Sequence, residues 1–167
     1  MTLQDIHNLV DYNYWARDRM LEAVDLLTPE QFLREVGGSF SSVRDTAAHV
    51  LAAEIVWYRR WQGESPAALS PSARFPDVAS LRAEWVEYEA QVRAFTAALA
   101  EDDITRVYNY KLTTGPSGSS PLWQMFQHLV NHGTYHRGQV TTLLRQMGAK
   151  PPQSTDMIGF FRGRSGG

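Results

Sequence analysis

The sequence predicts an all-α protein, a four-helix bundle with a long crossing loop and short extra elements. Three observations lead to this fold class. Four long segments repeat their apolar residues with the period of a helix, several of them begin at residues that cap helices, and one proline-rich segment is long enough for a connection that is not a hairpin. At 167 residues the chain has the usual size of one domain, so we expect a single domain over residues 1–167.

The first half of the chain contains two long helical patterns and one short one. The first pattern runs from about Leu3 to Leu27, where apolar side chains recur at steps of three, four or seven residues. The segment TPEQF then indicates a new helix start, with Thr28 as its N-cap and Pro29 at its first position. After a loop, Ser41-Ser42 predicts the start of a second long helix that ends at about Gln62.

The second half begins with the longest predicted loop. Residues 63–77, GESPAALSPSARFPD, carry three prolines and are expected to cross the end of the bundle, with Asp77 as the N-cap of the third long helix. Thr105–Thr114 predicts a short extended piece or a hairpin, and Gly115–Pro121, GPSGSSP, is expected to be a flexible loop. The fourth long helix follows and ends at Met147-Gly148.

Composition and charge limit the classes of function. The 16 basic and 18 acidic residues nearly balance, which argues against nucleic acid as a partner. The chain has no cysteine, so a metal site must use nitrogen or oxygen ligands. No signal peptide and no apolar run of membrane-spanning length is apparent, so we expect a cytoplasmic protein with no membrane partner.

Three of the five histidines lie on the fourth helix at intervals of four residues. At about 100° per residue, His136 falls inside the apolar stripe, His132 lies on its flank, and His128 lies at or beyond its edge. His128 and His136 are about 12 Å apart along the axis, too far for both to bind one ion through bonds of about 2.1 Å. The positions of the histidines around the helix therefore favour His132 with His136 as a metal-binding pair.

A third ligand must come from another helix. His49 shares a face of the second long helix with small and apolar residues, whereas His7 lies among polar residues and is expected to be solvated. Asp45, one turn before His49, is placed to hold an imidazole through its other nitrogen, and His128 and Gln139 are further candidates to support the site. Because a buried histidine is more often a hydrogen-bonded core residue, spacing alone leaves both interpretations open. The expected ligands are His49, His132 and His136.

Several motifs together resemble the DinB-like (DinB/YfiT-like) bacterial proteins. They are YNYW at Tyr12–Trp15, SVRDTAAHVLAAE, and above all NHGTYHRGQV followed by PPQSTD. The resemblance covers nearly the whole chain and implies a metalloenzyme, often a homodimer, that holds zinc or nickel through one histidine of the second long helix and two of the last. These positions correspond to the three expected ligands. Many relatives have a histidine where this chain has Tyr135, which is expected to alter the edge of the pocket.

The expected function is that of a metal-dependent enzyme with a small-molecule substrate. Three neutral imidazoles leave at least one position of the ion open, which is the pattern of catalytic sites. Some family branches resemble S-transferases, in which the metal activates a low-molecular-weight thiol such as bacillithiol, mycothiol or glutathione. The alternatives are a metal-dependent hydrolase and a stress-induced protein that binds a metal or small ligand without catalysis.

Two further residues carry structural expectations. Asn13 interrupts the apolar stripe of the first helix, and we expect it to bond to a neighbouring helix rather than to line the pocket. Gly138 lies inside the last helix, where glycine costs about 1 kcal/mol relative to alanine. A close contact with another helix is the expected compensation.

Overall fold

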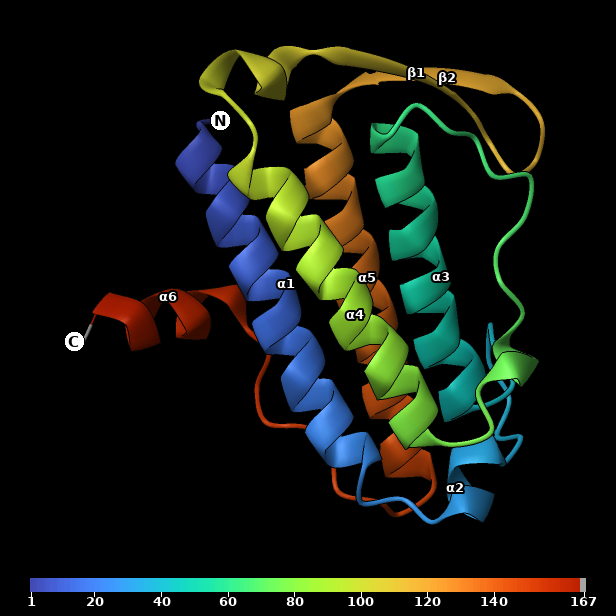
Figure 1. Ribbon diagram of the computed structural model, residues 1–167. Coiled ribbons are helices and arrows are strands. Elements are labelled where there is room, and N and C mark those ends of the chain that lie inside the picture. The colour runs from blue at the N-terminus through green and yellow to red at the C-terminus, as the bar shows by residue number, and fades with distance from the viewer. Residues whose placement is uncertain (166–167) are drawn as a thin grey trace.

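The computed structural model describes residues 1–165, and its long helices pack side by side as a bundle (Figure 1). The predicted all-α class is confirmed. The four long helices are α1 (Leu3–Val24), α3 (Val43–Trp61), α4 (Val78–Ala97) and α5 (Leu122–Gln146). The shorter helical segments are α2 (Pro29–Leu33), α6 (Met157–Ser165) and the 3-10 helices η1 (Ser72–Arg74) and η2 (Glu101–Thr105).

The helix starts follow from local capping chemistry. The hydroxyl of Thr28 accepts a hydrogen bond from the backbone of Gln31, and Pro29 occupies the first turn of α2. Ser42 caps α3 and Asp77 caps α4 in the same way, so these predicted starts are confirmed. The first helix ends at Val24, three residues before the predicted end. The short helix α6 was not expected from the sequence.

A two-stranded hairpin precedes α5. Strand β1 (Val107–Lys111) pairs antiparallel with β2 (Ser117–Pro121), in the register that places Tyr110 opposite Gly118. Of the two forms predicted for Thr105–Thr114, the short extended piece is confirmed as β1. Its partner β2 lies in Gly115–Pro121, so the prediction of a flexible loop there was wrong. A Cβ at Gly118 would lie 2.6 Å from the Tyr110 ring, so this packing requires a residue that composition alone associates with loops.

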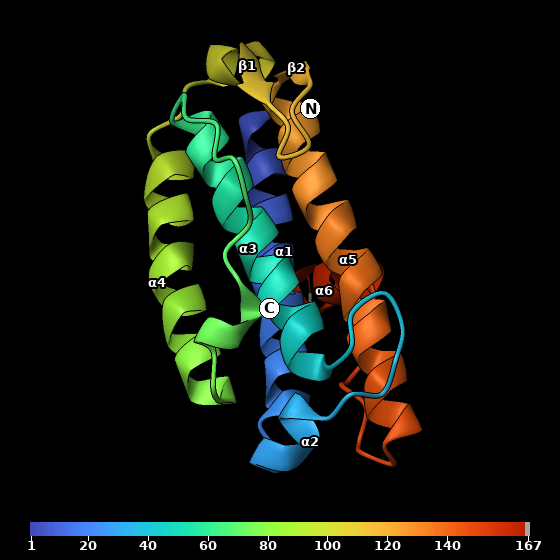
Figure 2. The ribbon, with the colours of Figure 1, turned by 90° about the vertical axis from the view of Figure 1, so that its right-hand side faces the viewer.

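The long loop runs along the bundle instead of across its end, which corrects the expected course. Helices α3 and α4 point in the same direction, opposite to α1 and α5 (Figures 1 and 2). Residues 62–77 therefore return the chain over the length of α3 before α4 begins. Among the described residues, no helix is long and apolar enough to cross a membrane.

A buried polar group, which we call the Glu54 cluster, joins the four long helices. Glu54 of α3 is 1% exposed and accepts hydrogen bonds from Asn13 Nδ2 of α1 and Trp85 Nε1 of α4, each at 2.9 Å. Asn13 Oδ1 accepts in turn from Arg137 Nη1 of α5 at 3.0 Å. The structural role expected for Asn13 is confirmed. Since buried polar groups are costly unless paired, the cluster fixes the register of the helices that carry the histidines.

The close helix contact expected at Gly138 is found at a different glycine of α5. A Cβ at Gly133 would lie 2.8 Å from Arg137 Nη1 and 3.1 Å from Asn13 Oδ1, so the Glu54 cluster requires glycine there. A Cβ at Gly138 would meet nothing within 4 Å. The packing explanation for Gly138 is therefore wrong.

Candidate metal centre

The three expected ligands converge between α3 and α5. His49 of α3 and His136 of α5 each place Nε2 3.1 Å from Nε2 of His132. One ligand atom from each of the three residues lies within 4.8 Å of the others. We call these three residues the histidine triad. The helical period brings the two α5 histidines onto one face, and the packing of α3 against α5 adds the third.

The contacts within the triad fit a bound cation better than a hydrogen-bonded core. Nε2 of His132 faces two other ring nitrogens, yet a ring nitrogen either carries one proton or presents one lone pair, so it can make only one good hydrogen bond there. Nitrogens that bind one divalent ion at about 2.0–2.1 Å are separated by roughly 3 Å. The donor set and its spacing therefore fit a divalent metal ion.

Gln139 determines which nitrogen of His136 is free. The Nδ1–H of His136 donates to Gln139 Oε1 at 2.7 Å, because an amide oxygen can only accept. This leaves Nε2 of His136 with its lone pair directed toward His132. The amide nitrogen of Gln139 donates to Ser39 Oγ at 3.3 Å, which connects the site to the loop before α3. Gln139 thus occupies the position of the supporting residue that metal-binding histidines usually require.

Burial keeps the triad neutral in the metal-free protein. Desolvation, followed by the neighbouring His136, lowers the pKa of His49 to about 4. Desolvation and the surrounding imidazoles lower the pKa of His132 to about 3, and burial also lowers the pKa of His136. At neutral pH the rings are therefore in the neutral form that binds metal ions.

The other predicted supporting residues lie elsewhere. The Asp45 carboxylate accepts from Arg44 Nε at 3.0 Å rather than from His49. The amide of Gln139, by contrast, does bond the ring of His136. The ring of His128 lies 4.8 Å from that of Trp57, and His128 does not belong to the triad. Contrary to expectation, His7 is half-buried, with Nε2 3.2 Å from the carbonyl oxygen of Thr96.

Phe40 is a site residue that the sequence analysis missed. Its ring stacks on His49 at a centroid distance of 4.3 Å and meets the ring of His136 edge-on at 5.6 Å. Phe40 lies in the loop between α2 and α3, where no helical or strand period applies, so no sequence pattern singles it out. It covers part of the triad with an apolar surface.

A cavity of about 420 Å³ adjoins the triad, between α5 and the loop that contains Phe40. Phe40 and Gln139 line this cavity and also contact the histidines. Tyr135 lies on the cavity wall with 63% of its surface exposed, and its ring centroid is 5.0 Å from that of His136. This position at the pocket edge agrees with the place expected for Tyr135.

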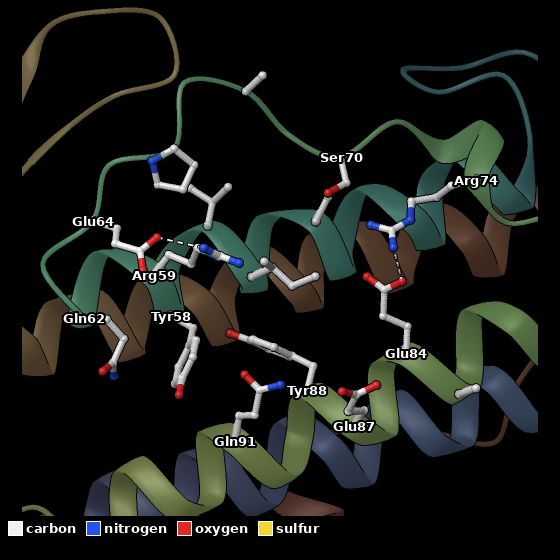
Figure 3. A pocket seen from close by; sticks show the side chains of 16 residues that line it. Tyr58, Arg59, Gln62, Glu64, Ser70, Arg74, Glu84, Glu87, Tyr88 and Gln91 are labelled. Atoms are coloured by element: carbon white, nitrogen blue, oxygen red, sulfur yellow. Dashed lines mark hydrogen bonds and ion pairs between the residues drawn. The ribbon is translucent and has the colours of Figure 1, made fainter.

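A larger cavity of about 900 Å³ lies between α3, the long loop and α4 (Figure 3). No residue of the triad lines it. Arg59 of α3 forms an ion pair with Glu64 of the loop, and Arg74 of η1 forms one with Glu84 of α4, each at 2.8 Å. These pairs attach the loop to both helices, and the cavity is separate from the histidine triad.

The fold agrees with the comparisons with known proteins. The protein DinB of Bacillus subtilis (strain 168) is 28% identical over 149 residues, which is 84% of each chain. The crystal structure of a DinB-like protein from Bacillus cereus ATCC 10987 shares the fold with a TM-score of 0.69, at 19% identity over 87% of this chain and 95% of that one. The family model of the DinB family matches residues 1–161 of the chain. The chain belongs to the DinB family.

Proposed function

We propose that this protein is a metal-dependent enzyme that transfers a low-molecular-weight thiol to an electrophilic small molecule. The observation that carries the proposal is the histidine triad, in which three neutral nitrogen donors converge and, within residues 1–165, no carboxylate or fourth histidine joins them. A site with three protein ligands leaves a coordination position for a substrate. The proposed metal is zinc or nickel, since imidazole nitrogen suits both.

The chain's own residues give this site its selectivity. The triad holds the ion, Gln139 fixes the tautomer of His136, and Phe40 shields His49 from water. A bound divalent ion lowers the pKa of a coordinating thiol, so that the thiol is ionised at neutral pH. The absence of cysteine means that no thiolate of the protein competes for the open position. In the transfer, the thiol loses its proton to solvent, a sulfur–carbon bond forms, and the leaving group departs with the bonding electron pair.

The surroundings of the triad favour thiol transfer over hydrolysis. A metal-dependent hydrolase needs a general base near the attacking water. Of the supporting residues considered above, Asp45 pairs with Arg44, the amide of Gln139 is not basic, and His128 lies outside the triad with its ring packed on Trp57. A thiol that ionises directly at the ion does not require such a base.

A cobalt(II)-substituted protein tests the proposal. Addition of bacillithiol, mycothiol, glutathione or coenzyme A should produce an intense sulfur-to-metal charge-transfer band, together with release of a proton near neutral pH. The band must come from the added thiol because the chain has no cysteine. The His132→Ala variant is the control and should show no band. If none of these thiols gives a band while the protein hydrolyses an ester or amide in a metal-dependent way, the transferase proposal fails and the hydrolase alternative replaces it.

A further inference from the structure

Gly138 leaves open space on the side of α5 that faces the cavity of about 420 Å³. Its φ is not in the left-handed region, and a Cβ added there would meet nothing within 4 Å. Neither backbone conformation nor packing therefore requires glycine at this position. Since a glycine inside a helix costs about 1 kcal/mol relative to alanine, the residue lowers stability and in return enlarges the cavity.

The cavity wall carries no charge. Among the described residues, none of those that line it is acidic, basic or a histidine. Its apolar surface comes from Val36, Phe40 and Leu143, and glycines of the loop and of α5 widen it. This composition disfavours a ligand that bears a carboxylate, phosphate or ammonium group, because a charge that leaves water needs a partner in the protein.

Most polar side chains of the wall already have partners within the protein. The hydroxyl of Thr46 donates to the backbone carbonyl of Ser42 at 2.9 Å, and that of Thr142 donates to the carbonyl of Gly138 at 3.1 Å. The amide of Gln139 is engaged by His136 and Ser39. The interior of the cavity therefore behaves as a mainly apolar surface.

The exposed part of the wall is more polar. Gln146 and Tyr135 are both exposed and both line the cavity, so an amide and a phenol hydroxyl are available to a ligand at its mouth. Phe40 lines the same cavity and stacks on His49. A ligand with an apolar body would thus lie against Phe40, close to the triad, and place a polar group near the mouth.

We propose that this cavity is a binding site for an uncharged organic molecule with an aromatic or similarly apolar body, and that this molecule is the electrophile. The assignment as electrophile rests on the proposed thiol transfer, whereas the binding of a neutral ligand does not. A cavity of about 420 Å³ lies within the range of ligand sites, about 300–1,000 Å³. The wall discriminates by charge, since none of the side chains that line it offers a partner to an ion.

Two fluorescent probes with the same ring skeleton test the charge rule on the full chain without added metal, because a cation on the triad would itself attract an anionic probe. N-phenylnaphthylamine is neutral, and anilinonaphthalene sulfonate adds one anionic group. The neutral probe should bind with one-to-one stoichiometry, and the anionic probe should bind about tenfold or more weakly, because its charge finds no partner. Equal binding of the two probes, or no binding of the neutral one, overturns the inference.

Gly138→Leu locates the site. The leucine side chain should occupy the cavity and weaken binding of the neutral probe about tenfold or more, and Gly138→Ala should have a smaller effect. Gly159→Leu is the matched control, because Gly159 is also a helical glycine with nothing within 4 Å of an added Cβ, but it lies on α6 and does not line the cavity. Thermal unfolding monitored by circular dichroism checks that each variant is folded.

The outcomes separate this inference from the proposed function. Unchanged binding of the neutral probe by Gly138→Leu, or equal weakening by Gly159→Leu, overturns the assignment of the cavity. Neither result affects the cobalt–thiol experiment, which reports on the triad. Conversely, an absent thiol band in a protein that binds the neutral probe through the Gly138 cavity refutes thiol transfer and leaves the neutral-ligand site in place.

Discussion

Replacement of Gln139 by leucine should weaken zinc binding about 10- to 100-fold while the bundle stays folded. The substitution removes one hydrogen bond and changes little else. Leucine and glutamine have similar helix propensities, and the side chain is only half-buried, so α5 should keep its stability. What is lost is the acceptor for His136 Nδ1–H, now at 2.7 Å, and with it the preference for the tautomer that leaves Nε2 free.

The magnitude follows from that one hydrogen bond. A hydrogen bond in a partly buried site contributes about 0.5–1.5 kcal/mol, and a buried donor left without a partner costs about 1–3 kcal/mol. Since about 1.4 kcal/mol corresponds to a factor of ten in an equilibrium constant, the loss corresponds to about one to two powers of ten in zinc affinity. This range agrees with the usual effect of removing a residue that supports a metal-binding histidine.

Competition of the protein with a chromophoric zinc chelator measures the affinity, and a two-variant design isolates the cause. Gln139→Glu keeps an acceptor for His136 and should retain zinc affinity. Gln146→Leu makes the same type of substitution two turns further along α5, where the side chain lines the cavity but does not contact the triad, and it should bind zinc as the wild type does. If Gln139→Leu binds zinc within about twofold of the wild type, or if Gln146→Leu loses as much affinity, the role assigned to Gln139 is refuted.

Three further predictions follow from the same geometry. Alanine at any position of the triad should remove most of the bound metal, whereas His128→Ala should retain it, as metal analysis can check; loss of metal in His128→Ala alone would contradict the ligand set. Glu54→Gln should lower the free energy of unfolding by about 1–3 kcal/mol in urea titrations. The N–H groups of Asn13 and Trp85 now each bond a separate carboxylate oxygen, whereas glutamine offers them only one oxygen between them. A change below about 0.5 kcal/mol would contradict this. Zinc affinity should fall less with decreasing pH than at a site of solvated imidazoles, because the pKa values of His49 and His132 lie at about 4 and about 3 and burial also lowers the pKa of His136. A loss as steep as three solvated imidazoles would give near pH 6.5 would contradict the burial of the site.

The helix starts could be predicted from the sequence because their causes are local. Thr28, Ser42 and Asp77 each bond a backbone group three residues later, so a short segment contains both partners. Strand β2 has a distant cause, since its residues pair with β1 and Gly118 lies under the ring of Tyr110. The direction of α4 is likewise not encoded in any one segment, which is why the loop was expected to cross the bundle's end.

The histidine triad and its surroundings show the same division. His132 and His136 lie on one helix, so the helical period alone places them on the same face. The third ligand, His49, was suggested by the small and apolar residues that share its helix face. Asp45 does not bond His49 because its carboxylate pairs with the neighbouring Arg44, and spacing along a helix does not reveal that choice of partner. Phe40 reaches the site from an irregular loop, and only the tertiary structure places it there.

The parallel course of α3 and α4 sets a minimum length for the segment that joins them. The 19 residues of α3, at about 1.5 Å each, make the helix about 28 Å long. An extended chain covers at most about 3.5 Å per residue, so fewer than about eight residues cannot return the chain to the end where α4 begins. Residues 62–77 amount to about twice that minimum, and the excess forms the turns that wall the larger cavity. A deletion below the limit would force α4 to run in the opposite direction, and the same helices would then specify a different topology.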